Sequence, residues 1–296
     1  MNRPTAWLPL PVAAALLAAL VGCGEQNAAV ADPDGDPDGQ RYQVSATVLE
    51  ASETGPQLCH AVADSLPPQC TGPEVVGWDW AAVEAESAGG TTWGSYLLTG
   101  TWDGARFTLT EPAQPDGGSQ QPGEPDQPDF TSPCPEPAGG WRPVDPATAT
   151  QAGLDAALAL AAEDPGYAGG WVDQSYLDQA GQPDPDDLEQ AANDPTKLVL
   201  NLRFTGDQQA REEPVRQVWG GALCLTGAEH TEAELLDIQQ RVHEDFPGLV
   251  FGSGPDPVAN TLSVQLFVAT EELQAELDQR YGDGTVTLAG WLRPVT

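Results

Sequence analysis

Basic side chains are scarce in this sequence of 296 residues. Lysine and arginine together number 11 against 45 aspartates and glutamates, which gives a net charge of −34 at pH 7, and Lys197 is the only lysine. Nucleic acids and anionic lipid headgroups are bound through basic patches. The composition therefore excludes nucleic acid as an expected partner. It favours a soluble chain without fixing its fold.

Catalytic sequence motifs are also missing. The sequence contains no nucleophile elbow, zinc-protease helix, phosphate loop or dinucleotide fingerprint. Its three histidines, His60, His230 and His243, follow no ligand or triad spacing, and each is interpreted as a surface or supporting histidine. Carboxylates are so numerous that no pair stands out as acid and base. We therefore predict no catalytic residue, no metal site and no cofactor.

The apolar run near the N-terminus is too short to span a membrane. Leu8–Leu20 comprises thirteen residues without a charge, whereas a membrane-spanning helix needs about 20 apolar residues. Arg3 and the N-terminal amine precede this run. A positive start followed by a short apolar run is typical of a signal peptide.

The run ends at Leu20-Val21-Gly22-Cys23, which resembles the lipobox of bacterial lipoproteins. The resemblance implies that residues 1–22 are a signal peptide, that the Cys23 thiol receives a diacylglyceryl group and that the chain is cut before this cysteine. Two acyl chains anchor a protein stably. The resemblance thus implies a membrane-anchored protein at the outer face of the cytoplasmic membrane. An ordinary secretory peptide with an incidental cysteine is the alternative.

Two segments rich in proline, glycine and acidic residues divide the remaining chain. Residues 23–40 are predicted to form a flexible acidic tether and residues 111–140 an extended linker, because such compositions bury too little apolar surface to fold. Asp34, Asp36 and Asp38 of the tether have the spacing of the first ligands of a calcium-binding loop. Ser45, however, stands where that loop requires glutamate. A solvated tether is the favoured interpretation.

Residues 41–110 predict a small all-β domain, an open barrel or sandwich of about five strands. Asp103-Gly104 lies between two alternating segments, the strongest short-range signal for a β-hairpin. A two-residue turn there would pair Gly100 with Phe107, so that Phe107 covers the bare backbone of Gly100. Four tryptophans of this region could form a platform for sugar rings beside Asp79, but a role in the core is favoured. They are Trp78, Trp80, Trp93 and Trp102.

Four cysteines remain after Cys23 is assigned to lipidation. An even number of cysteines in an exported protein indicates disulfides, and four cysteines allow three connectivities. Cys59 and Cys70 are close in sequence, and the prolines between them favour a turn. We predict a Cys59–Cys70 bond and, by elimination, a Cys134–Cys224 bond that holds the linker's end to the second domain.

Residues 141–296 predict an α+β domain. A strand at 198–204 is followed by a helix at 231–245 that begins with a Thr231–Glu234 capping box. Two strands, a helix at 271–281 and a final strand at 285–291 follow. This β-α-β-β-α-β order predicts a ferredoxin-like, split βαβ fold.

The function expected from these features is that of a lipid-anchored envelope protein of the binding or interaction class, with an envelope protein or a glycan as partner. The alternative is a carboxylate-dependent hydrolase that acts on envelope glycans or peptides. A deep cleft holding two carboxylates about 5–10 Å apart would favour that alternative.

Overall fold

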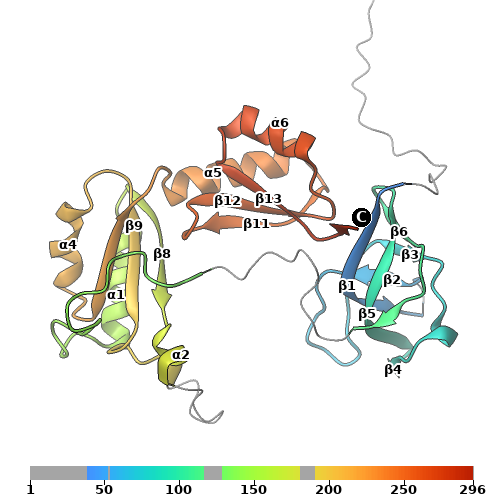
Figure 1. Ribbon diagram of the computed structural model, residues 1–296, viewed down its shortest axis with the longest axis horizontal. Helices are drawn as coiled ribbons and strands as arrows, with labels where there is room; N and C mark the ends of the chain where they lie inside the picture. Colours follow the sequence, from blue (N-terminus) through green and yellow to red (C-terminus); the bar gives the residue numbers. More distant parts are fainter. Residues whose placement is uncertain (1–38, 53, 117–128, 181–190, 296) are drawn as a thin grey trace, which may run out of the picture.

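A computed structural model of the chain describes residues 39–52, 54–116, 129–180 and 191–295. The predicted signal peptide, the lipobox with Cys23 and the calcium-like aspartates lie outside these residues. No helix within the described ranges is long and apolar enough to cross a membrane. Figure 1 shows three parts: a barrel at the right, a unit at the left and a C-terminal unit between them. The unit at the left is here called the middle unit, because it comes second in chain order.

The barrel consists of five strands that close on themselves. They are β1 (Arg41–Glu50), β2 (Gln57–Cys59), β3 (Glu74–Val76), β5 (Thr91–Trp102) and β6 (Arg106–Leu109). Each pairs with the next in the order β1-β2-β3-β6-β5, and β5 pairs back with β1 along ten residues. The predicted small β barrel is therefore confirmed, and it is closed rather than open. Closure leaves no free edge among these five strands.

Four shorter elements of the described chain lie beside the five barrel strands. A 3₁₀ turn, Trp80–Ala82, follows β3. Strands β4 (Glu86–Ala88) and β7 (Gln114–Pro115) both pair with β5. Strand β14 (Arg293–Pro294) pairs with β1, so the C-terminal segment returns to the barrel.

The β5–β6 hairpin has a different register from the predicted one. Trp102 pairs with Phe107 and Gly100 with Leu109, a shift of two residues. The Asp103 carboxylate accepts hydrogen bonds from the backbone N–H groups of Ala105 and Arg106, which widens the turn. Because a shift of two keeps every side chain on its face, Phe107 still covers Gly100: a Cβ at Gly100 would lie 2.8 Å from a Phe107 ring carbon.

The middle unit is a three-stranded sheet with helices on one face. Its elements are α1 (Gln151–Ala162), β8 (Tyr167–Asp173), α2 (Tyr176–Ala180), β9 (Val199–Phe204), α4 (Gln209–Arg216) and β10 (Ala222–Gly227). Strand β9 lies between β8, to which it is antiparallel, and β10, to which it is parallel. Leu200, Leu202 and Phe204 pack against apolar residues of α1 and α4.

The C-terminal unit repeats this order, except that its described residues contain no counterpart of α2. It comprises α5 (Glu232–Asp245), β11 (Val250–Asp256), β12 (Thr261–Leu266), α6 (Glu271–Tyr281) and β13 (Val286–Gly290). Strand β12 is again central, antiparallel to β11 and parallel to β13. The predicted capping box of Thr231 and Glu234 is present at the start of α5. The α-β-β-α-β order with this sheet arrangement therefore occurs twice.

The predicted ferredoxin-like sheet is wrong, although the α+β class is confirmed. Strand β9 pairs with β8 and β10 in the middle unit and does not join the sheet of β11, β12 and β13. The sequence pattern does not reveal β8, because Gly169 and Gly170 interrupt its strand pattern. Without β8, strand β9 is grouped with the helix and strands of the C-terminal unit.

Both predicted disulfides are present. Cys59 is bonded to Cys70 and Cys134 to Cys224, each with Cα atoms 5.8 Å apart. The Cys134 bond fixes the chain segment 129–141 against the face of the middle sheet that lies opposite its helices. There the Trp171 indole donates to the Phe130 carbonyl at 3.0 Å.

The middle and C-terminal units are joined through Arg203 of β9. Its guanidinium donates to the carbonyl oxygens of Gly227, Pro257 and Val258 at 2.7–3.2 Å. Burial at this contact lowers the pKa of Arg203, and the Asp256 charge opposes that shift. The guanidinium thus bridges the end of β10 and the β11–β12 connection.

Candidate functional site

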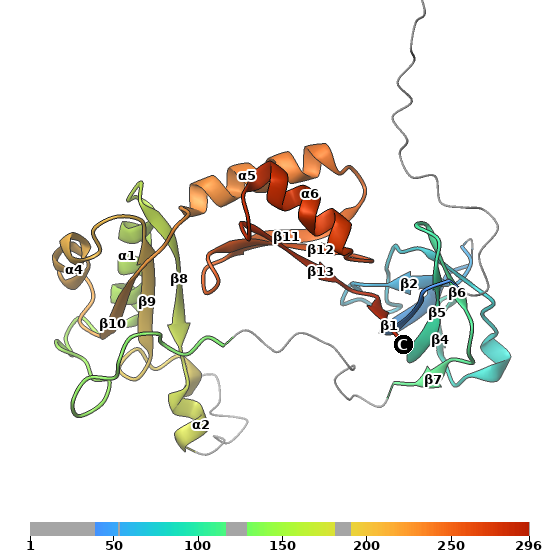
Figure 2. The ribbon, with the colours of Figure 1, turned by 45° about the horizontal axis from the view of Figure 1, so that its top comes forward.

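The barrel and the C-terminal unit meet at a junction built by the last residues of the chain. Tyr42 and Gln43 of β1 pair with Pro294 and Arg293 of β14. Just before β14, Leu292 is buried within the barrel core. Figure 2 shows β13 leading directly from the C-terminal sheet to β1.

Five aromatic side chains, here called the junction cluster, fill this region. They are His60, Trp102, Phe251, Phe267 and Trp291. Trp102 stacks on Phe267 with centroids 4.9 Å apart, and the imidazole of His60 lies 4.6 Å from the Phe251 ring. Phe267 contacts Phe251 at 5.2 Å and Trp291 at 5.8 Å. Such ring pairs contribute about 0.5–1.5 kcal/mol each beyond their buried area.

A β-bulge places one member of the junction cluster. The pairing of β11 with β12 shifts between Val250 and Gly252, so that Phe251 is the extra residue. Bulges redirect side chains in this way. Phe251 consequently contacts His60 of the barrel, while Val250 packs with the core of its own unit.

A cavity of ≈ 430 Å³ opens beside the junction cluster. The barrel contributes His60, residues 71–73 and the turn that begins at Trp102; the C-terminal unit contributes Leu249 and Phe267 together with their neighbours. Among the described residues that line it there is no carboxylate and no cysteine, and His60 is the one titratable side chain. Apolar walls with few polar groups are typical of ligand sites. The chemistry that this lining supports is binding of rings or apolar groups.

The core role favoured for the four tryptophans holds for Trp78, Trp80 and Trp102, which pack against the barrel core. Trp78 packs edge-on against Trp80 at 5.1 Å and against Tyr96 at 5.0 Å, beside the barrel core. Trp93 lies on β5 opposite Glu86 of β4. Trp102 alone among the four lines the junction cavity.

The three histidines lie in separate places. His60 is exposed, as the sequence indicated, and its ring also belongs to the junction cluster. No local sequence signal reveals this contact, because it depends on strand β11, far along the chain. His230 lies near Asn260, whose side chain accepts its backbone N–H at 3.0 Å. The Nε2 atom of His243 is 2.8 Å from the Ser253 hydroxyl.

Other cavities hold pairs of carboxylates. Asp79 and Glu111 line one of ≈ 330 Å³, Glu136 and Asp173 line one of ≈ 280 Å³, and Glu163 and Asp164 line another of ≈ 280 Å³. Asp164 forms an ion pair with Arg211 at 3.0 Å. Glu111 forms an ion pair with Arg41 at 2.8 Å. The Asp173 carboxylate accepts the backbone N–H groups of Ser132 and Ser175 at 2.8 and 2.7 Å. These contacts give one carboxylate of each pair a structural role. In the described part of the chain, no group of three histidine, cysteine or acidic residues could hold a metal ion.

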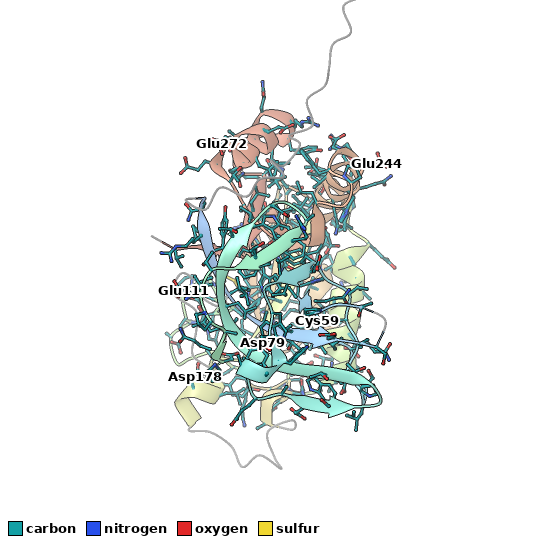
Figure 3. The ribbon with its side chains drawn as sticks, turned by 90° about the vertical axis from the view of Figure 1, so that its right-hand side faces the viewer. Cys59, Asp79, Glu111, Asp178, Glu244 and Glu272 are labelled. Atoms are coloured by element: carbon teal, nitrogen blue, oxygen red, sulfur yellow. A yellow bond between two sulfur atoms is a disulfide. The ribbon has the colours of Figure 1, made fainter. Side chains whose placement is uncertain are left out.

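The surface is anionic because acidic side chains far outnumber basic ones, and most of the basic ones are paired. Seven basic side chains of the described residues form ion pairs with carboxylates: Arg41, Arg106, Lys197, Arg211, Arg216, Arg241 and Arg280. Figure 3 shows acidic side chains on the barrel (Asp79, Glu111), the middle unit (Asp178) and the C-terminal unit (Glu244, Glu272). Hydrogen bonds from Arg211 lower the pKa of Asp164, which keeps this carboxylate charged well below neutral pH.

Comparison with protein-family models, curated proteins and solved structures finds no match to this chain.

Proposed function

We propose that this protein is a lipid-anchored binding protein of the cell envelope, attached through Cys23, and that its ligand site is the junction cavity. The observation that carries the binding role is the cavity of ≈ 430 Å³ with aromatic walls, built jointly by the barrel and the C-terminal unit. The described residues of its lining provide aromatic rings for contact with a ligand and contain no pair of acidic and basic catalytic groups.

The two disulfides support the proposed compartment. Disulfides form and persist in oxidising compartments outside the cytoplasm, and both pairs lie in the described residues. An exported chain is what the lipobox-like start implies, so two independent features agree on the location.

Replacing the proposed anchor residue is expected to block both acylation and cleavage. In the source cell, Cys23→Ser should lose the acyl mass and retain residues 1–22, because the lipobox resemblance assigns both the acyl attachment and the cut to this cysteine. Intact mass of the isolated protein measures both changes. Val21→Ala, which alters the tolerant position and keeps the cysteine, should begin at Cys23 and carry the acyl mass. Equal masses of the two variants, apart from the substitutions themselves, would refute the anchor.

Replacing Trp102 is expected to weaken binding to envelope material. Purified protein lacking residues 1–23 should co-sediment with isolated cell-wall material. Trp102→Ala should weaken this binding about tenfold, because the cavity loses its largest ring contact. Trp93→Ala, on the same strand but away from the cavity, is the matched control. Equal binding by both variants would exclude the cavity. Release of soluble wall fragments that is abolished by Asp79→Asn or Glu136→Gln would favour the hydrolase alternative instead.

A further inference from the structure

The sheet of the C-terminal unit has one face that no described element covers. Leu262, Val264 and Leu266 of β12 point into the core beneath α5 and α6. Because side chains alternate along a strand, Ser263 and Gln265 point to the opposite side. Figure 2 shows both helices on one face of this sheet. The elements that pack on this sheet most extensively are α5 and α6, and the residues on its other face are exposed or half-buried.

This open face is almost free of charge, in a chain of net charge −34. By the strand registers, its outward positions are Gly252, Gly254, Thr261, Ser263, Gln265, Thr287 and Ala289, with Asp256 at the far end. The Asp256 carboxylate is turned into the β11–β12 connection, where it accepts the backbone N–H groups of Val258 and Ala259. Only uncharged groups remain across the centre of the face.

The polar groups at the centre of the face are available to a ligand. The Gln265 side chain is exposed and extends over Gly252, where a Cβ would lie 2.5 Å from its amide oxygen. Within the described residues, neither the Gln265 amide nor the Ser263 hydroxyl has a hydrogen-bond partner. An amide and a hydroxyl can both donate and accept hydrogen bonds.

The same face of the middle unit is covered. There, Cys134 and Trp141 pack against Val199, Ala222 and Cys224, and segment 129–141 crosses the sheet. The repeated fold thus has one face closed by its own chain and one left open. The open face continues into the junction cluster, because Phe267 and Trp291 directly follow β12 and β13.

We infer that the open face and the junction cavity together bind an uncharged glycan chain. This inference rests on the proposed binding function and names its ligand class. Aromatic rings of the junction cluster contact the apolar face of a sugar ring, as tryptophan rings do in ligand sites. Gln265 and Ser263 hydrogen-bond to sugar hydroxyl or acetamido groups. A neutral chain avoids the repulsion that the acidic surface imposes on anionic polymers.

The test uses purified protein lacking residues 1–23 and an array of neutral and acidic glycans. Neutral chains such as N-acetylglucosamine and glucose tetramers should be bound, and galacturonate tetramers should not. Calorimetry with the tightest neutral glycan should show a loss of about tenfold for Gln265→Ala, the value of one hydrogen bond. Trp102→Ala should lose at least as much.

Gln240→Ala makes the same chemical change on the exposed surface of α5 and should bind like the unaltered protein. The inference is overturned if no neutral glycan binds, if acidic glycans bind best, or if Gln265→Ala and Gln240→Ala are equal. If neutral glycans fail while Trp102→Ala still weakens cell-wall binding, the proposed binding function stands and the ligand is of another class.

Discussion

Replacing Phe107 by alanine is expected to destabilise the barrel by about 3–5 kcal/mol, the usual cost of truncating a buried phenylalanine. The Phe107 side chain is 0% exposed. It lies over Gly100 and in register with Trp102 and Val75 on the two neighbouring strands. Loss of the ring leaves a cavity at the centre of a small core, which cannot collapse without moving these strands.

Hydrogen exchange of the β1 and β5 amides measures this loss, because these strands pair along ten residues. The matched control is Phe130→Ala. That side chain is 49% exposed and belongs to the segment over the middle sheet, so barrel protection should not change. Equal protection of the β1 and β5 amides in both variants would show that the Phe107 ring does not stabilise the barrel.

Removing the Cys134–Cys224 disulfide is expected to have the second large effect. The bond closes a separation of 90 residues, for which the chain-entropy model gives about 4–5 kcal/mol, and the model gives about 3 kcal/mol for the separation of 11 residues between Cys59 and Cys70. The double variant Cys134→Ser with Cys224→Ser should therefore destabilise its unit more than Cys59→Ser with Cys70→Ser destabilises the barrel.

Hydrogen exchange of β9 and β10 measures the first effect and that of β1 the second. Loss of the Cys134 bond should also expose the Trp171 indole, because segment 129–141 is held over the middle sheet by this bond and by the Trp171–Phe130 hydrogen bond. A smaller loss for the long loop than for the short one would show that the bond contributes little beyond the packing of Trp141.

The proposed function places different demands on the three parts of the molecule. The barrel and the C-terminal unit share a cavity, so a change in either is expected to affect binding. The middle unit contacts the C-terminal unit through Arg203 and the Gly169–Pro257 approach. Its own outer face is occupied by segment 129–141, which leaves it a supporting role in the proposed site.

Local features of this protein follow from the sequence by itself. The capping box at Thr231 and Glu234 needs only residues three apart, and the presence of a hairpin at Asp103–Gly104 also follows from neighbouring residues, although its register does not. Both disulfide pairs also follow from cysteine count and spacing. In each case the deciding interaction lies within a short segment, or the number of alternatives is very small.

Only the tertiary structure decided the pairing of the sheets and the candidate site. Gly169 has a φ of 118°, and a Cβ there would lie 2.6 Å from Pro257 of the C-terminal unit. The reason for a glycine at this position of β8 is therefore a contact with another unit. The junction cluster likewise joins His60 to Phe251 and Trp291. Contacts between residues so far apart depend on the packing of whole units, and no local pattern of residues encodes them.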